Sequence, residues 1–464
     1  MPKNRFVTRL GAIFLLACLL FTVGTVNPAQ AAEVKVLVDG KALTMDVKPV
    51  VEGNRVLVPL RAIFEALGAE VKWDEKTRTV TAVKGSARIQ LAIGSNTALK
   101  DGARVTLDVP ARIIDGRTLV PLRFVTEALG AEVEWRASTA TVAITRKTQL
   151  ITITDSMGRR VQVPSPPNRI VVIIGHVAEV ISALGAADRV VGVSDDLGFF
   201  PQALLKDKPK VGKAFTPSVE RIVELKPDVV FASRWLKPEL AQQIEAAGIP
   251  LVYLVCWEPR TMVQDVLTLG DILGKEKEAR EYADFYNRYL QMIQGRIAKL
   301  KPEDKPLVYL EGYSDYSTVA AGAGGAELLE LAGARNIAAG EPVPHPKVSP
   351  EWVVSKNPQV IIKAVAHTSV PSGYLESDEA MRKKRDEIIS RPGWKGIAAV
   401  KHNRVYVITG EIYASPRTYI GIAYFAKWLH PELFRDLDPE AMHREHLQRF
   451  HGLKLEGAWV YPEK

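Results

Sequence analysis

The sequence contains little cysteine, and this scarcity excludes several kinds of protein. Two of its 464 residues are cysteines, Cys18 and Cys256. Cys18 lies in an N-terminal segment that we expect to be removed, so Cys256 would be the one thiol of the mature chain and could not form an internal disulfide. Iron–sulfur enzymes are excluded because each cluster needs several thiolates. We expect Cys256 to be a buried core residue beside Trp257.

The sequence also lacks the short motifs of the common nucleotide-dependent and hydrolytic enzymes. It contains no P-loop, no Gly-x-Ser-x-Gly nucleophile elbow, no His-Glu-x-x-His motif and no dinucleotide-binding fingerprint in the right context. The formal net charge is +8, but no run rich in Lys and Arg is interleaved with aromatic residues. We therefore expect neither enzymatic activity nor a nucleic-acid partner.

Residues 1–31 have the features of a secretory signal. Basic residues precede an apolar run over residues 10–26, which is short for a membrane span, and residues 29–31 form a small-residue cleavage motif. Two alternatives stay open, a lipidated Cys18 and an uncleaved signal that anchors the chain. In each case we expect an exported protein that is extracytoplasmic, in the periplasm or at the cell surface.

Residues 34–147 contain a tandem repeat. Residues 55–73 return as residues 117–135 at a constant offset of 62 (117 − 55 and 135 − 73). Each copy is predicted to form strands, one short helix with an apolar face and then a hairpin. We therefore expect two small β-rich α+β modules, over residues 34–86 and 87–147.

These repeats resemble the domain named for the N-terminus of copper amine oxidases, which is common in exported bacterial proteins. The resemblance does not imply oxidase chemistry, because the chain lacks the Asn-Tyr-Asp/Glu signature of the quinone cofactor and residues 34–147 contain no His or Cys. The Arg and Trp residues of the repeats, including Trp73 and Trp135, are predicted to pack and brace the modules. Two roles stay open for residues 34–147, association with the cell wall or surface and a passive spacer.

A capped helix followed by a buried strand occurs twice in the rest of the chain, over residues 218–231 and 349–362. In both copies a Ser precedes the helix and a Glu follows two positions later, Glu220 and Glu351, seven residues before a proline (227 − 220 and 358 − 351). A Ser at this position caps the helix and an acidic first turn suits the helix dipole. The repetition indicates two pseudo-equivalent lobes, each with a glutamate on the same outer face.

The expected fold class is α/β. Apolar and aromatic side chains at helical spacing predict one helix over about residues 275–300, roughly 35 Å long. We expect two Rossmann-like lobes, about 168–260 and about 305–462, joined by this long helix. A linker and an alternating hairpin at 148–167 would connect the first lobe to the two repeat modules.

With these features, residues 168–462 resemble the periplasmic-type substrate-binding proteins of ABC importers. The subclass is the one with a single connecting helix, which serves iron chelates, haem, cobalamin and related ligands. The stretches that carry the resemblance are residues 169–175, 183–194, 330–338 and 430–434. The resemblance implies capture of a small-molecule metal chelate without a cofactor, and delivery to an ABC permease dimer with its ATPase subunits.

The resemblance also implies that Glu220 and Glu351 dock on the two permease subunits. A siderophore-type iron chelate is the leading ligand. Haem, cobalamin, or a different oxyanion or metal complex are alternatives. A cell-surface or wall adhesion protein that has lost transport is the alternative from another functional class.

Ligands of open α/β sheets bind beyond the carboxyl ends of the strands. The loops expected there are rich in aromatic and charged residues, a mix that suits a large planar or metal-chelate ligand. Our predicted ligand-binding residues are His176, Trp235, Trp257, Glu311, Tyr313, Tyr316, Tyr413 and Arg417, and the Phe199–Phe200 pair lies in one of the same loops. Helix capping is the alternative role for His176, and packing within a lobe is the alternative for the two tryptophans.

His443 and His446 stand three positions apart near the C-terminus and could share a helix face. Because no third ligand follows at a suitable spacing, we interpret residues 443–451 as a solvated amphipathic helix. No metal site is predicted.

Overall fold

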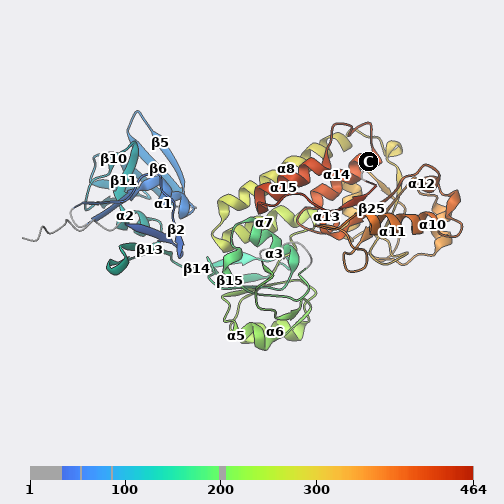
Figure 1. The fold of residues 1–464 in the computed structure, drawn as a ribbon, viewed down its shortest axis with the longest axis horizontal. Coiled ribbons are helices and arrows are strands. Elements are labelled where there is room, and N and C mark those ends of the chain that lie inside the picture. Colours follow the sequence, from blue (N-terminus) through green and yellow to red (C-terminus); the bar gives the residue numbers. More distant parts are fainter. Residues whose placement is uncertain (1–33, 53–54, 85–86, 198–204, 463–464) are drawn as a thin grey trace, which may run out of the picture. The chain divides into compact units, whose positions relative to one another are not determined.

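The computed structural model describes residues 34–52, 55–84, 87–197 and 205–462 (Figure 1). The expected signal with Cys18 and the Phe199–Phe200 pair lie outside these residues. The chain divides into two compact units, unit 1 and unit 2, with the boundary between Thr145 and Arg146. Within the described ranges, no helix combines the length and the apolar character needed to cross a membrane.

Unit 1 is built mainly of short strands. Its elements are β1 (Lys35–Val38), β2 (Lys41–Ala42), β3 (Val50–Glu52), β4 (Arg55–Pro59), α1 (Leu60–Ala66), β5 (Glu70–Asp74), β6 (Thr79–Lys84), β7 (Ala87–Ala92), β8 (Thr97–Lys100), β9 (Ala103–Thr106), β10 (Arg112–Ile114), β11 (Arg117–Pro121), α2 (Leu122–Ala128), β12 (Ala131–Arg136), η1 (Ala137–Thr139) and β13 (Thr141–Arg146). The strand orders are β12-β13-β1-β2, β10-β11-β4-β3 and β5-β6-β7-β8-β9.

The two sequence repeats are interleaved in unit 1. β1 of the first copy pairs in parallel with β13 of the second, and β4 pairs antiparallel with β11. Phe64 of α1 and Val125 of α2 belong to one shared hydrophobic core. The segments 34–86 and 87–147, expected as two modules, therefore form one folded unit, because each copy completes the sheets of the other.

Lobe 1 of unit 2 contains a parallel sheet of order β17-β16-β20-β21. Its elements are β14 (Gln149–Thr154), β15 (Arg160–Ser165), β16 (Ile170–Val172), α3 (Gly175–Ala183), η2 (Ala187–Arg189), β17 (Val190–Val193), β18 (Gly212–Lys213), β19 (Thr216–Pro217), α5 (Val219–Glu224), β20 (Val229–Ala232), α6 (Pro238–Ala246), β21 (Leu251–Tyr253) and α7 (Pro259–Leu273). Cys256 is buried after β21, as predicted.

The hairpin β14–β15 is anchored on α7. Ser156 donates a hydrogen bond to Asp265 Oδ1 at 2.9 Å, and Ser165 donates to the Asp271 carbonyl at 2.7 Å. Residues of the expected linker and hairpin, 148–167, thus belong to unit 2 and extend the surface of lobe 1.

A single helix of 22 residues, α8 (Glu276–Ile297), connects the lobes and confirms the predicted connecting helix. The left-handed Gly274 ends α7 and turns the chain into it. Lobe 2 then has a five-stranded sheet of order β23-β22-β24-β25-β26, in which β26 alone runs antiparallel to its neighbour. In Figure 1, α8 runs alongside helices of the C-terminal lobe.

The elements of lobe 2 are η3 (Pro302–Asp304), β22 (Leu307–Glu311), α9 (Gly324–Leu331), β23 (Arg335–Asn336), α10 (Pro350–Lys356), β24 (Val360–Val365), α11 (Glu379–Ile389), η4 (Trp394–Gly396), α12 (Ala398–Lys401), β25 (Val405–Thr409), α13 (Gly410–Tyr413), α14 (Thr418–Leu429), α15 (Pro439–His446), the π-helix η5 (Leu447–His451) and β26 (Val460–Tyr461). The α/β class with two lobes and one connecting helix is confirmed.

Candidate ligand-binding site

Loops at the carboxyl ends of the strands form one face of unit 2, called the loop face here. Three aromatic side chains on it are well exposed: Phe215 at 48%, Trp235 at 65% and Tyr313 at 48%. Phe215 lies between β18 and β19, Trp235 follows β20, and Tyr313 follows β22. Within the described part of unit 2, no other Phe, Trp or Tyr side chain is in the exposed class. Both lobes therefore offer apolar contact area at this face.

Trp257 and His176 lie deeper, where the lobes meet. The Trp257 ring packs so closely on Gly324 of α9 that a Cβ there would come within 2.3 Å of it, and the Trp257 carbonyl accepts a hydrogen bond from Thr418 at 3.1 Å. His176 opens α3 with its ring centroid 6.2 Å from that of Trp257. Burial lowers the pKa of His176 to about 4, so its imidazole is neutral near pH 7.

Tyr413 continues this layer in lobe 2. Its ring meets the Tyr313 ring edge-on at 6.1 Å, and its hydroxyl packs on Gly325, where a Cβ would come within 2.1 Å. The neighbouring Glu411 has both carboxylate oxygens buried and no hydrogen-bond partner for them among the described residues. Burial raises the pKa of Glu411 although Arg417 opposes the shift. Sequence reasoning selected the nearby Tyr413 and Arg417 but not Glu411.

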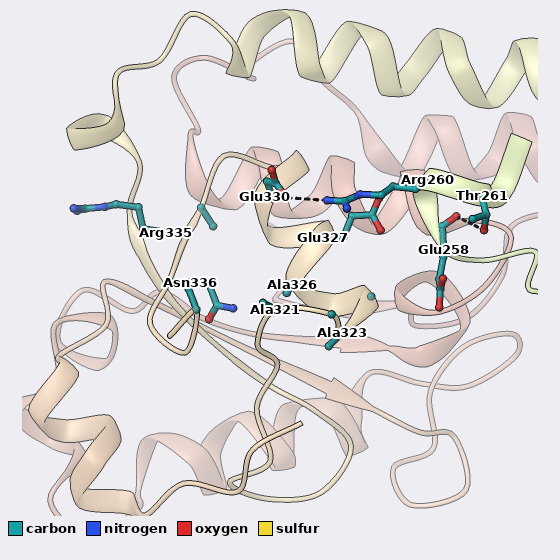
Figure 2. A pocket seen from close by; sticks show the side chains of 14 residues that line it. Glu258, Arg260, Thr261, Ala321, Ala323, Ala326, Glu327, Glu330, Arg335 and Asn336 are labelled. Atoms are coloured by element: carbon teal, nitrogen blue, oxygen red, sulfur yellow. Dashed lines mark hydrogen bonds and ion pairs between the residues drawn. The ribbon is translucent and has the colours of Figure 1, made fainter. Parts of the chain in front are cut away.

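A pocket of about 730 Å³ lies between the start of α7 in lobe 1 and α9 in lobe 2 (Figure 2). Its lining includes Glu258, Thr261, Gly322, Ala326, Arg335 and Asn336. Arg260 of α7 crosses the pocket, with its Nε 3.1 Å from Glu327 and a terminal nitrogen 3.3 Å from Glu330. Glu258 also pairs with Arg234 at 2.7 Å, so the pocket adjoins the loop face beside Trp235.

Arg417 is buried, and in this structure its guanidinium is not turned to the loop face. It donates to Glu179 of α3 at 2.8 Å and lies 3.1 Å from His443 Nε2, above the ring of Trp459. Burial raises the pKa of Glu179 to about 7, against the opposing effect of Arg417. The pair joins lobe 1 to the segment before α14 of lobe 2. Sequence reasoning missed Glu179, which is 238 positions away.

Glu311 is likewise fully buried and bonded. Arg391 donates to its two oxygens at 2.6 and 2.9 Å, Lys363 lies 2.9 Å away, and the Tyr309 hydroxyl donates at 3.0 Å. Burial opposes ionisation of Glu311, but Arg391 and Lys363 outweigh it and hold the pKa of this carboxyl below its usual range. Glu311 therefore stabilises the interior of lobe 2, and both of its oxygens already have hydrogen-bond partners, so neither is free to bind a metal.

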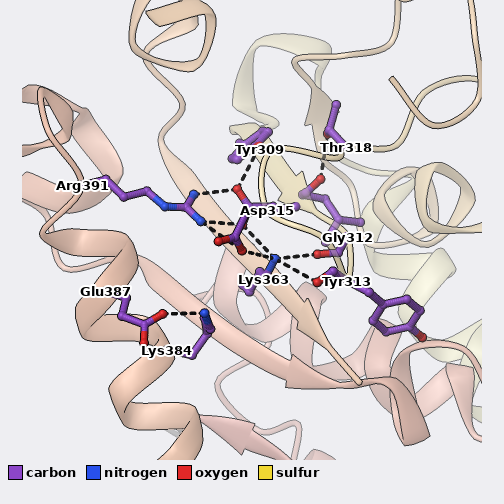
Figure 3. Close-up of polar contacts among 11 residues, drawn as sticks. Tyr309, Gly312, Tyr313, Asp315, Thr318, Lys363, Lys384, Glu387 and Arg391 are labelled. Atoms are coloured by element: carbon purple, nitrogen blue, oxygen red, sulfur yellow. Dashed lines mark hydrogen bonds and ion pairs between the residues drawn. The ribbon is translucent and has the colours of Figure 1, made fainter. Parts of the chain in front are cut away.

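This ionic network fixes the loop that carries Tyr313. Lys363 also donates to the Gly312 carbonyl at 2.8 Å and to Asp315 at 3.0 Å. Tyr316 is half-buried beneath the guanidinium of Arg391, which lies 4.4 Å from its ring centroid. Figure 3 shows the Tyr313 ring turned away from the network. Tyr316 thus packs in the loop while Tyr313 stays accessible.

The prediction that His443 and His446 lie on a solvated helix is wrong. Their exposed fractions are 1% and 0%. The His446 ring meets Tyr282 of α8 edge-on, and its Nδ1 lies 3.0 Å from the Tyr419 hydroxyl of α14. α15 is buried on this side because α8 and α14 cover it.

Glu220 and Glu351 occupy equivalent positions in the two lobes. Both side chains are exposed in the first turn of a short helix, α5 or α10. Ser218 and Ser349 cap these helices by accepting hydrogen bonds from the backbone three residues on, at 3.3 and 3.1 Å. α5 and α10 lie at the far ends of their lobes (Figure 1).

Unit 1 contains a groove of about 970 Å³. Residues that line it include Met45, Leu60, Arg61, Glu65, Trp73 and Ile113. Trp73 is 39% exposed, and its counterpart in the second repeat, Trp135, is 49% exposed. Both tryptophans are thus partly exposed on β5 and β12, which are edge strands of their sheets, and their role in packing and bracing the repeats stays a prediction.

The network around Glu311 can be tested with Lys363→Met. Removing a partner of a buried carboxylate should lower the free energy of unfolding at pH 7 by about 3 kcal/mol. Because the folded pKa of Glu311 is lowered, its contribution is present above the unfolded pKa of a glutamate and is lost as the pH falls through the folded pKa. The deficit of the variant, measured by urea unfolding, should therefore shrink in acid.

Lys384→Met is the matched control for Lys363→Met. Lys384 pairs with the exposed Glu387, so this change should cost less than about 1 kcal/mol. Equal losses in the two variants, or a loss in Lys363→Met that does not change with pH, would contradict the assignment.

Two family models match the chain. The copper amine oxidase N-terminal domain matches residues 37–144, and the periplasmic binding protein family matches residues 170–412. The N-terminal resemblance drawn from the repeats is thereby confirmed.

Relatives and solved structures agree with the second match. The chain is 26% identical over 294 residues to YvrC of Bacillus subtilis, an uncharacterised ABC transporter substrate-binding lipoprotein, with 62% of this chain and 87% of the relative covered. It is 25% identical over 335 residues to the molybdate-binding protein MolA of Haemophilus influenzae, with 64% and 90% covered.

The TroA-like periplasmic binding protein FepB from Veillonella parvula has a similar structure, with a TM-score of 0.58 at 26% identity. The superposition covers 67% of this chain and 99% of that protein. Because the family model spans more than half of the chain, the chain belongs to the periplasmic binding protein family, as a member similar to substrate-binding proteins of ABC transporters.

Proposed function

We propose that this protein captures a siderophore-type metal chelate at the loop face and delivers it to the permease of an ABC importer outside the cytoplasm. The observation that carries the proposal is the position of Phe215, Trp235 and Tyr313. These exposed aromatic side chains of unit 2 all lie at the carboxyl ends of strands, and they come from both lobes. Exposed apolar groups gathered at one face are typical of a binding site.

Charged groups beside these aromatics support an anionic chelate. The Arg234 guanidinium lies 5.2 Å from the Trp235 ring centroid, and Lys213 is exposed next to Phe215 in the β18–β19 hairpin. A guanidinium stacked on an aromatic ring can contact a planar ligand and its anionic edge together. Haem and cobalamin offer similar flat surfaces, whereas molybdate, named for the relative MolA, is small and would need little aromatic area.

The ligand proposal can be tested on residues 32–464 by titration with ferric siderophores, haemin, cobalamin and molybdate. Tryptophan fluorescence and visible spectra would report binding. A ferric chelate should saturate the protein, and Trp235→Ala and Tyr313→Ala should each weaken binding on the order of tenfold through lost stacking and apolar contact. Trp352→Ala, in α10 away from the loop face, should leave binding unchanged.

Two results would count against the chelate proposal. Saturable binding of molybdate alone, insensitive to the aromatic variants, would point to an oxyanion site. Equal effects of Trp235→Ala and Trp352→Ala would show that the loop-face aromatics do not contact the ligand.

We propose further that Glu220 and Glu351 dock the two lobes on the paired permease subunits. Their equivalent helical positions and their exposure support this role. Exposed charges of this kind contribute orientation and association rate more than affinity. The double variant Glu220→Ala with Glu351→Ala should therefore bind ligand normally but abolish ATP-coupled uptake in cells.

The control for docking is Glu281→Ala with Glu303→Ala, which removes two other exposed glutamates from unit 2. This control should transport at the wild-type rate. Normal uptake by the Glu220 and Glu351 double variant, at equal protein level, would refute the docking proposal.

For unit 1 we propose attachment to cell-wall polysaccharide through its groove. Trp73 is partly exposed and lines the groove, and Arg61 and Glu65, which also line it, provide hydrogen-bonding groups. Sugar rings bind in this way, with flat contact on an aromatic ring and polar groups around it. The groove is the specific feature that favours attachment over a passive spacer.

Sedimentation with purified cell wall tests the attachment. Trp73→Ala should reduce the bound fraction of residues 32–464 several-fold, because the aromatic contact in the groove is lost. Trp135→Ala is the matched control, since Trp135 is the repeat-equivalent exposed tryptophan and is not among the groove-lining residues. Equal sedimentation of wild type and Trp73→Ala would favour the spacer.

A further inference from the structure

Two histidines near the C-terminus are brought together by an uncommon helix. His446 ends α15 and His451 ends the π-helix η5 that follows. In an α-helix, residues five positions apart point about 140° away from each other around the axis. The π-helix bonds residues five positions apart, so it places the two side chains on one side. Their ring centroids are 5.5 Å apart.

A carboxylate from the other lobe completes the group. Glu179 of α3, in lobe 1, offers an oxygen so near the two imidazoles that the three candidate ligand atoms all lie within 4.8 Å of one another. Glu179 and His446 are buried, and His451 is half-buried. α15 and η5 of lobe 2 thus supply two nitrogen donors, and α3 of lobe 1 supplies one oxygen donor.

A second, independent observation concerns a ring nitrogen of His446. Its Nδ1 lies 3.0 Å from the Tyr419 hydroxyl, whereas its Nε2 is buried and has no hydrogen-bond partner among the described residues. Leaving a buried polar atom unsatisfied is unfavourable, and native structures rarely do so without a reason. A hydrogen bond on the far nitrogen is also the arrangement that orients a metal-binding histidine.

Arg417 contacts the two oxygens of the Glu179 carboxylate unequally. Its contact with Glu179 Oε1 is 2.8 Å, but the second contact, with Oε2, is 3.4 Å. The weaker contact leaves Oε2 able to bind another cation. The positive charge of Arg417 works against a metal ion, and among the three candidate ligands the Glu179 carboxylate is the group that opposes this charge, while the imidazoles supply neutral nitrogen donors.

We propose that Glu179, His446 and His451 bind one divalent transition-metal ion of the zinc type. Two imidazoles, one carboxylate and a water molecule form a tetrahedral set that suits this ion. Its ligands come from α3 of lobe 1 and from the C-terminal segment of lobe 2, so the ion ties the lobes together. This ion is a resident structural group and is separate from the ligand proposed for the loop face.

The experiment is a Zn²⁺ titration of the full chain after treatment with a chelator, with Co²⁺ as a spectroscopic substitute. One Zn²⁺ should bind per chain, and Co²⁺ should give the visible bands of a tetrahedral site. His451→Gln should weaken Zn²⁺ binding at least about 100-fold, since even changes behind the ligands of a metal site cost 10–100-fold. His446→Gln should do the same.

Two further variants are controls for Zn²⁺ binding at histidines outside the proposed site. His402→Gln changes an exposed histidine and His176→Gln changes the one near the loop face, and both should retain full affinity. Loss of binding in His176→Gln with normal binding in His451→Gln would place the ion elsewhere and overturn the proposal.

Absence of stoichiometric Zn²⁺ binding by the wild-type chain would also overturn it. If circular dichroism shows that His446→Gln does not fold, the half-buried His451 decides the question. Chelate titration in the absence of Zn²⁺ tests the loop face separately, so failure of one proposal does not decide the other.

Discussion

A buried ion pair between Glu179 and Arg417 joins the two lobes and constrains how they meet. Removing two charges from water costs several kcal/mol for each ion, and a close hydrogen-bonded contact returns much of this cost. Such a pair adds little net stability, but it penalises every arrangement that separates the charges. α3 of lobe 1 and the segment before α14 of lobe 2 must therefore meet at one position, which also sets where Trp257 packs on Gly324.

Lobe 2 uses a second buried network for a similar purpose. Glu311, Lys363 and Arg391 hold the backbone of the loop that carries Tyr313. Glu311, which was predicted to contact a ligand, thus supports the interior of lobe 2 instead. The aromatic side chains at the loop tips remain available, and they project from a backbone that is held in place. A binding surface of this kind is ordered before the ligand arrives, which reduces the entropy lost on binding.

The sequence predicted the features that depend on local pattern. The connecting helix α8 follows from the spacing of its apolar residues, and the capped helices α5 and α10 follow from Ser218 and Ser349. The features it did not predict depend on distant residues. The shared core of unit 1 comes from pairing β1 with β13, and helical spacing alone could not reveal the partner of Arg417.

The histidines show the same limit in another form. No metal site was predicted because no third ligand stands at a suitable spacing from His443 and His446. With α-helical spacing, His451 lies on a different face from His446. The π-helix changes this geometry, and no residue type marks a π-helix in the sequence as a glycine marks a turn. The third donor, Glu179, belongs to the other lobe. A three-residue group of this kind can be found only once both the backbone form and the lobe contact are known.

The lobes also share one hydrophobic core, and this limits how they can move. Val172 of lobe 1, Phe285 of α8 and Ile362 of lobe 2 belong to one continuous cluster of buried side chains. Separating the lobes widely would expose part of this core, at about 25 cal/mol for each Å² of apolar surface. Small rotations about α8 cost far less than such an opening. We therefore expect ligand recognition to rest on the fixed positions of the loop-face side chains, with a modest adjustment across the Arg260 pocket.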